Sequence, residues 1–315
     1  MKKLFILLLC LALTAGLCAC GATPAPTEAP LFPTEAPTVP DVTEAPVETP
    51  ENGAPKVDES QTQQETLQQE LYRDDKFAFT VTETEYNEHL GLQVHVLCEN
   101  NSDSSLLFTW NNTAVCGYMY EPYWAEEVAP GKKVNSTVGF DTYELEKMGI
   151  TSVDDIIFTL SVIDMDHFLD APLVNQGFRI YPTGKTPDQV VYPEYVHKNG
   201  ETVIAENDVL TFIIESVEDE VSEFYTLNCY VANHTGKNLM ISWDAVSVNG
   251  FMVDPFWATS VSAGMQAFSQ INFLRADLEA QGIEDVTELE FTILAYDDDN
   301  WDADYLLSET YTFNP

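Results

Sequence analysis

The chain has 315 residues, of which 52 are acidic and 13 are basic, so its formal net charge is −39. Such an excess of carboxylates repels nucleic acids and anionic lipid headgroups, and we therefore expect no nucleic-acid partner. Hydrophobic residues make up 45% of the chain, which is typical of globular domains rather than of a fully disordered protein.

The N-terminus has the pattern of a secretory signal, because two lysines precede an apolar run from Leu4 to Leu17. This run is shorter than the roughly 20 residues that span a bilayer as a helix. The motif LCACG at residues 17–21 resembles the lipobox of bacterial lipoproteins. The resemblance implies that residues 1–19 are a lipoprotein signal peptide and that Cys20 becomes the acylated N-terminus. Such a protein is held on the outer face of the bacterial cytoplasmic membrane; the alternative is an ordinary secreted protein.

Residues 20–66 have the composition of a disordered tether. Nine prolines lie between Pro24 and Pro55, and the tetrapeptide TEAP occurs three times. Recurrent proline favours polyproline II, and like charges extend the chain, so we expect a semi-rigid stalk. The glutamine-rich stretch from Ser60 to Leu71 predicts a short helical lead-in.

The rest of the chain is a duplication. Residues 75–182 align with residues 208–315 at a constant offset of 133 and without a gap, and 27 of the 108 positions are identical. A period this long indicates repeated domains rather than a solenoid. We predict a first domain at 67–182, a linker at 183–200 and a second domain at 201–315.

Both copies have the alternating pattern of half-buried β-strands, as in Phe77, Phe79 and Val81. The pair Asn249-Gly250 favours a two-residue hairpin, and Cys116-Gly117 stands at the same place in the first copy. Short helices are expected at 142–148 and 276–281, each followed by a glycine. The pattern predicts an all-β chain of two tandem immunoglobulin-like antiparallel β-sandwiches, each with one short helix.

The resemblance to immunoglobulin-like domains includes a tryptophan, Trp110 or Trp243, on the apolar side of a central strand. The second copy also has the pattern NGFMxxPFWA, a glycine turn, a short helix ending in GI, and then FTIxxxDxD. On these motifs both copies resemble tandem β-sandwich modules of uncharacterised surface lipoproteins of gut Firmicutes. The first copy departs from the pattern at Cys116. The resemblance covers residues 75–315 and implies a fold and a location, but it brings no established activity.

Catalytic motifs are absent from the sequence, which has no HExxH, GxSxG, CxxC or glycine-rich phosphate loop. None of the five histidines has a histidine at the equivalent position of the other copy. Cys98 and Cys229 lie on the apolar side of predicted strands and are expected to be buried small hydrophobes. The chain is therefore predicted to be noncatalytic.

An acidic segment near the C-terminus is the candidate metal site. Asp297, Asp299, Asp302 and Asp304 fall within eight residues at a predicted loop. Calcium takes six to eight oxygen ligands, which alternating carboxylates on a curved loop can supply in part. The spacing does not match the standard twelve-residue calcium loop, and the other interpretation is a solvated acidic turn. No other cofactor is expected.

Aromatic residues after a proline are the candidate ligand-binding residues. Tyr123 and Trp124 follow Pro122, and Phe256 and Trp257 occupy the same places in the second copy. Proline ends a strand, so these rings are expected near a rim, where flat rings suit sugar or peptide contacts. The alternative is that they pack at the edge of the sandwich or between the domains.

These observations predict a lipid-anchored extracellular protein that acts as a ligand-binding or adhesion module. Its partners are the membrane, through the N-terminal lipid alone, and an extracellular ligand, either a glycan or a protein. A binding module predicts an exposed aromatic or acidic feature common to both copies. A structural spacer predicts that the shared residues are buried. An accessory subunit of an exported enzyme or transporter predicts an exposed apolar patch on one copy.

Overall fold

The computed structural model describes residues 64–65, 68–219 and 223–315, the first pair by its backbone alone. The described residues belong to one compact unit, Glu59–Pro315, which contains both copies of the duplicated segment. The predicted signal peptide, Cys20 and nearly all of the predicted tether lie outside the described residues.

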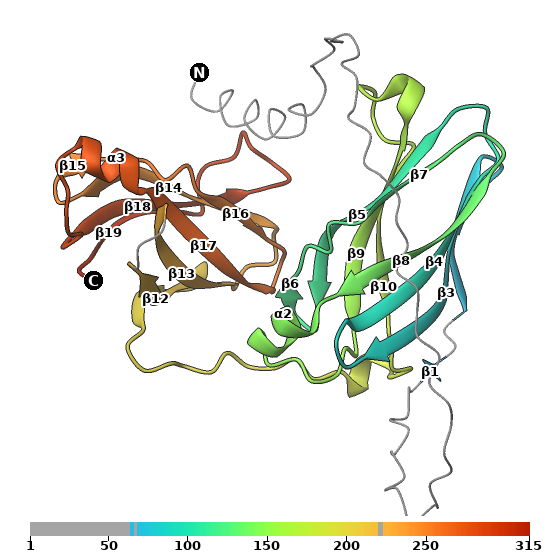
Figure 1. Cartoon of the computed structure of the whole chain (residues 1–315), viewed down its shortest axis with the longest axis horizontal. Coiled ribbons are helices and arrows are strands. Elements are labelled where there is room, and N and C mark those ends of the chain that lie inside the picture. Colours follow the sequence, from blue (N-terminus) through green and yellow to red (C-terminus); the bar gives the residue numbers. More distant parts are fainter. Residues whose placement is uncertain (1–63, 66–67, 220–222) are drawn as a thin grey trace, which may run out of the picture. The chain divides into compact units, whose positions relative to one another are not determined.

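The first copy consists of β1 (Gln64–Glu65), β2 (Gln69–Arg73), β3 (Phe77–Asn87), β4 (Gly91–Asn100), β5 (Leu106–Val115), β6 (Tyr118–Met119), β7 (Ala125–Val128), β8 (Lys133–Phe140), α2 (Thr142–Lys147), β9 (Ile156–Asp164), η1 (Met165–His167) and β10 (Val174–Ile180). One sheet has the order β1-β3-β4-β8, with β2 also paired to β3. The other joins β10, β9 and β5, with β6 and β7 on β5. This is the strand order of an immunoglobulin-like sandwich, with β3, β4 and β8 as A, B and E, and β5, β9 and β10 as C, F and G (Figure 1).

The second copy follows η2 (Pro187–Gln189) and consists of β11 (Thr202–Glu206), β12 (Leu210–Glu218), β13 (Phe224–Asn233), β14 (Leu239–Val248), β15 (Phe251–Met252), β16 (Ala258–Val261), β17 (Gln266–Leu274), α3 (Arg275–Ala280), β18 (Leu289–Asp297) and β19 (Leu307–Phe313). Its sheets have the orders β11-β12-β13-β17 and β15-β14-β18-β19, with β16 also on β14. The all-β fold class is thereby confirmed.

Each core is built by the residues that the alternating pattern predicts. Phe77, Phe79 and Val81 are fully buried. Trp110 is 1% exposed, and its ring stacks on Phe158 with the centroids 3.7 Å apart. In the second copy, Trp243 stacks on Phe291 at the same distance. Aromatic pairs of this kind contribute beyond the apolar area that they bury.

The predicted helical lead-in is wrong where the structure describes it, because residues 69–73 form strand β2. Gln69 pairs with Val81, and Tyr72 pairs with Phe79, after a register shift between Glu70 and Tyr72. The ring of Tyr72 also stacks on Phe77, with centroids 4.9 Å apart. A polar segment with little helical periodicity thus becomes a strand because an available sheet edge satisfies its backbone groups.

The two copies are in direct contact through β6 and β17, which form a parallel bridge between Tyr118 and Gln266. The backbone N–H of Gln266 donates to the carbonyl oxygen of Gly117 at 2.9 Å. Tyr118 is 1% exposed, and its ring lies on that of Phe268 with a centroid distance of 5.5 Å and an interplanar angle of 6°. One nine-stranded sheet therefore runs through both copies.

The segment between the copies bonds to each of them. The hydroxyl of Tyr192 donates to Asp155 of the first copy at 2.6 Å. That of Tyr195 donates to Glu215 of the second copy at 3.0 Å, and its ring stacks on Tyr230 with centroids 3.9 Å apart. These contacts hold the connection against both sandwiches.

Phe268→Ala is expected to loosen the junction while leaving both cores intact. The ring is partly buried, so we expect a loss of about 2 kcal/mol, less than the 3–5 kcal/mol typical of Phe→Ala in a full core. Chemical denaturation measures the loss, and small-angle scattering measures the accompanying rise in radius of gyration. The control is Asn135→Ala, at the equivalent position of the first copy, where the side chain is exposed. Equal behaviour of the two variants would show that the ring does not hold the copies together.

Candidate functional site

Most features that the copies share have a structural explanation. Asn100 and Asn233 are 0% and 2% exposed. Their Nδ2 groups donate to equivalent carbonyls, those of Val128 at 2.7 Å and Val261 at 2.9 Å. Each therefore ties the turn after its strand to the opposite sheet, which gives the shared asparagine a structural role.

The predicted calcium residues do not converge. Asp297 accepts from Lys237 at 2.8 Å and from the N–H of Asp299 at 3.1 Å, and Lys237 lowers the pKa of the Asp297 carboxyl. Asp302 and Asp304 are exposed. Within residues 64–65, 68–219 and 223–315, no group of three or more His, Cys, Asp or Glu side chains is placed to hold a metal ion. The geometry gives the calcium prediction no support.

The acidic loop instead has a structural role that recurs in both copies. Asp164 accepts from the N–H of Asp166 at 3.0 Å, which is the same turn that Asp297 and Asp299 form. A side-chain carboxylate that accepts an N–H two residues later closes an Asx-turn. The turn thus explains the first of the two shared aspartates, Asp164 and Asp297, whose carboxylates close it.

The four candidate aromatic residues divide into a buried pair and an exposed pair. Trp124 and Trp257 are each 9% exposed. Their indole N–H groups donate to Ser136 at 3.0 Å and to Ser269 at 2.9 Å. The two tryptophans therefore pack into their own sandwiches, as the alternative interpretation of the sequence holds.

Tyr123 and Phe256 point outward, with exposed fractions of 91% and 79%. Their φ angles are +49° and +51°, in the left-handed region. This conformation costs a residue with a Cβ about 1–2 kcal/mol. The N–H of Phe256 donates to the Asp254 carboxylate at 2.8 Å, and that of Tyr123 bonds to Glu121, so each turn is fixed by the acid that precedes the proline. We call these two segments, 121–124 and 254–257, the aromatic turns.

Strained backbone is repeated in the same places in both copies. All six described non-glycine residues with positive φ form three equivalent pairs: Asn112 with Ala245, Cys116 with Asn249, and Tyr123 with Phe256. The first pair lies at the bulges of β5 and β14, and the second forms the hairpin turns. The third pair, unlike the others, exposes a large aromatic side chain.

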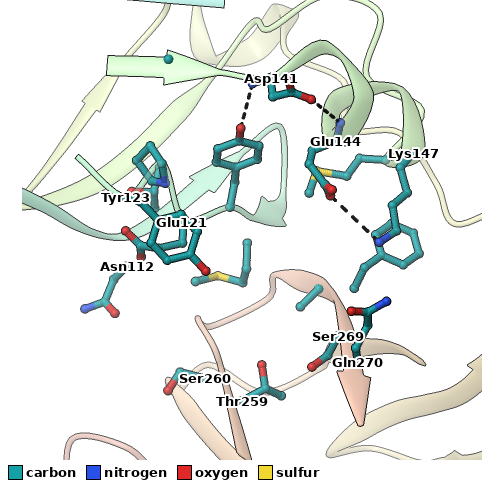
Figure 2. Close-up of a pocket in the computed structure, with 18 of the residues that line it drawn as sticks. Asn112, Glu121, Tyr123, Asp141, Glu144, Lys147, Thr259, Ser260, Ser269 and Gln270 are labelled. Carbon is teal, nitrogen blue, oxygen red and sulfur yellow. Dashed lines mark hydrogen bonds and ion pairs between the residues drawn. The ribbon is translucent and has the colours of Figure 1, made fainter. Parts of the chain in front are cut away.

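A cavity of about 870 Å³ lies between the two copies, with Tyr123 at its rim. The first copy lines it from the aromatic turn and α2, and the second lines it from β16 and β17. Figure 2 shows Asn112 and Glu121 on one side and Thr259 and Gln270 on the other. The sequence patterns did not identify Asn112 or Glu121. A signal for Glu121 was present, because in both copies an acidic residue stands directly before the proline, the exposed aromatic residue and the tryptophan.

The charges of this cavity are largely engaged. Asp141 accepts from the backbone at the start of α2, and Glu144 pairs with Lys147 at 4.0 Å. Glu121 is exposed as a residue, yet desolvation by the groups around its carboxyl raises its pKa, which the N–H of Tyr123 opposes. The hydroxyl of Thr113, in a residue 1% exposed, has no hydrogen-bond partner within the described part of the chain. The cavity thus offers mainly neutral hydrogen-bonding groups.

The three cysteines in the described part of the chain lie in surroundings that make them poor nucleophiles. Cys98, Cys116 and Cys229 are free and buried, which confirms the prediction for the first and last of them. Burial raises the pKa of all three thiols, so the reactive thiolate form is disfavoured.

Comparison with known proteins gives no family: no protein-family model matches the chain, and a search of curated proteins finds no match. The resemblance to surface lipoproteins therefore remains a prediction. None of the helices in the described part of the chain is long and apolar enough to cross a membrane.

Replacing the exposed aromatics by glycine should not weaken the fold. Tyr123→Gly and Phe256→Gly are expected to leave the unfolding free energy unchanged or to raise it by up to about 1 kcal/mol, because glycine adopts positive φ without strain. Trp124→Ala, next in sequence, should lower it by about 3 kcal/mol or more, since its ring is in the core. Urea denaturation measures all three. A loss above about 1 kcal/mol for either glycine variant would assign the exposed ring a packing role.

Proposed function

We propose that the protein is a lipid-anchored surface protein of a bacterium, and that it is a noncatalytic ligand-binding or adhesion module. The observation that carries the proposal is the pair of aromatic turns. Each copy places a large aromatic side chain in solvent, in a conformation that costs free energy, where packing does not require it. Strain that the surrounding structure maintains is characteristic of functional sites.

A structural spacer fits these observations less well. A spacer requires that the residues common to both copies serve folding, as Asn100, Asn233 and the two buried tryptophans do. Tyr123 and Phe256 do not meet that requirement, because they bury little surface. An exposed aromatic feature common to both copies is what a binding module predicts.

The anchor and the location are supported by the N-terminal sequence, in which Cys20 closes the LCACG motif after a short apolar run. Beyond residue 20 the chain has 52 acidic and 11 basic residues, a net charge of −41. Such a charge disfavours direct adsorption to anionic lipids, so a covalent lipid is the proposed means of attachment.

Attachment is tested in the producing bacterium by labelling with a radioactive fatty acid. The wild-type chain should incorporate the label and sediment with membranes, whereas Cys20→Ser should lose the label and appear in the medium or as an unprocessed precursor. Cys18→Ser is the control, because the same motif assigns that residue to the removed peptide. Incorporation that survives Cys20→Ser would refute the anchor.

Binding is tested with the chain carrying Cys20→Ser, immobilised and exposed to purified cell-wall polysaccharides, mucin glycans and matrix proteins. We expect retention of at least one of these ligands, and we expect it to fall about tenfold in Tyr123→Gly/Phe256→Gly, the loss corresponding to one or two aromatic contacts. The urea denaturation described above checks that the glycine substitutions do not weaken the fold, so that a loss of retention reports on binding. Retention that is indifferent to both rings, or no retention at all, would favour the spacer.

An accessory-subunit role is the second candidate, and one asymmetry between the copies favours it. Phe251 and Met252 of β15 are 48% and 69% exposed, whereas the equivalent Tyr118 is 1% exposed against β17. The second copy thus presents an apolar strand edge that the first copy has covered. Phe251→Ser/Met252→Ser is the corresponding arm of the binding test, and loss of a protein ligand in this arm alone would support the second candidate.

A further inference from the structure

We infer that the cavity between the two copies binds an uncharged oligosaccharide, with Tyr123 as the ring on which a sugar stacks. The inference rests on the proposed function, since it names the ligand class of one of the two aromatic turns. It is carried by the cavity, its neutral polar lining and the position of Tyr123.

The size and lining of the cavity suit a polar, neutral ligand. Its volume of about 870 Å³ falls in the range of roughly 300–1,000 Å³ typical of small-molecule sites. Amides and hydroxyls line it from both copies, among them Asn112, Thr113, Ser260 and Gln270. Ser260 already donates to Asp298 at 3.2 Å, and Gln270 donates one amide hydrogen to Asn228 at 2.9 Å. The amide of Asn112, the oxygen of Ser260 and the remaining donor and acceptor of Gln270 are left to meet the hydroxyls of a sugar. A purely apolar ligand would displace water from these groups and would offer no hydrogen bonds in place of those that the water had made.

The charges near the cavity argue against ionic ligands. An anion would meet Glu121, Asp141 and Glu144 on a chain that is already strongly acidic. Its one lining cation, Lys147, pairs with Glu144 and lies 5.4 Å from the Phe268 ring centroid. A cation would find Asp141 and Glu144 already occupied. Glu121 remains as an acceptor for a hydroxyl group.

Three aromatic rings lie at the cavity, and the fold leaves one of them exposed. Tyr120 accepts the N–H of Asp141 at 2.8 Å, and its ring lies 5.2 Å from that of Phe140. Phe268 is stacked on Tyr118. Tyr123 is 91% exposed at the rim, held there by its turn. A flat ring that the turn places at the rim can cover the C–H face of a pyranose while the walls bind its hydroxyls.

The second copy provides a matched control. Phe256 has the same exposed, left-handed conformation on an equivalent turn. It does not line this cavity. A ligand of the cavity should therefore distinguish the two aromatic turns, whereas a ligand that merely adheres to exposed rings should not.

The test is calorimetric titration of the chain carrying Cys20→Ser with four neutral probes: cellohexaose, mannohexaose, xylohexaose and the hexamer of N-acetylglucosamine. At least one is expected to bind. Tyr123→Ala and Glu121→Gln should each weaken that binding about tenfold. The first variant removes the stacking contact, and the second removes the charge from a hydrogen bond to the sugar. Phe256→Ala should leave it within about twofold, which corresponds to less than 0.5 kcal/mol. Thermal unfolding of each variant confirms that it is folded.

The inference is overturned if none of the four probes binds, if Phe256→Ala weakens binding as much as Tyr123→Ala, or if hexagalacturonate or spermine binds in place of the neutral probes. The proposed function fails separately. A protein or charged ligand that requires Tyr123 would refute the oligosaccharide and leave the binding module standing. Both proposals would be refuted together if no ligand, in the retention test or in this titration, bound more weakly when Tyr123 or Phe256 was replaced.

Discussion

The hydrogen bond from the N–H of Gln266 to the carbonyl of Gly117 is the contact on which the arrangement of the site depends. It brings β6 of one sandwich alongside β17 of the other, and the stacked rings of Tyr118 and Phe268 cover it. Glycine is required at position 117, because φ is +88° and a Cβ would approach the ring of Tyr192 to 2.7 Å. The aromatic turn leaves β6 from this point, so the same contact that joins the sheets also sets the turn opposite β16 and β17.

Duplication has therefore produced two copies with equal folds and unequal surroundings. In the first copy the edge strand β6 is covered by its neighbour; in the second the equivalent β15 is an open apolar edge. The surface on which β6 packs explains the asymmetry. Phe268 has Asn135 as its equivalent in the first copy, so the surface that receives β6 is not repeated on the other sandwich. A cavity formed between copies is consequently unique, although each aromatic turn is present twice.

The fold and the aromatic residues of the site were predictable from local patterns, whereas the cavity was not. Alternation identified strands whose apolar side chains are buried, and Asn249-Gly250 identified a hairpin because both residues need positive φ. Strand β2 was not predicted, because its residues do not alternate between apolar and polar. It is a strand only because it pairs with β3. The cavity depends on Tyr118 meeting Phe268 across 150 residues of sequence, which no local spacing encodes. For Tyr123 and Trp124 the sequence left two interpretations, and the left-handed turn decides between them by directing one ring outward and the next inward.

The aromatic turn itself explains how a strained residue can serve recognition. Glycine would adopt φ near +50° without a steric penalty, while tyrosine incurs about 1–2 kcal/mol there. The tyrosine side chain recovers little of that cost by burial, since it is 91% exposed. The cost is offset instead by the neighbours, because the acid before the proline binds the N–H of Tyr123 and the buried Trp124 is bonded to Ser136. These contacts fix the backbone on both sides of the ring, so binding would order the side-chain torsions of Tyr123 but would not have to order the turn. A side chain that is pre-organised in this way retains more of its contact free energy as affinity.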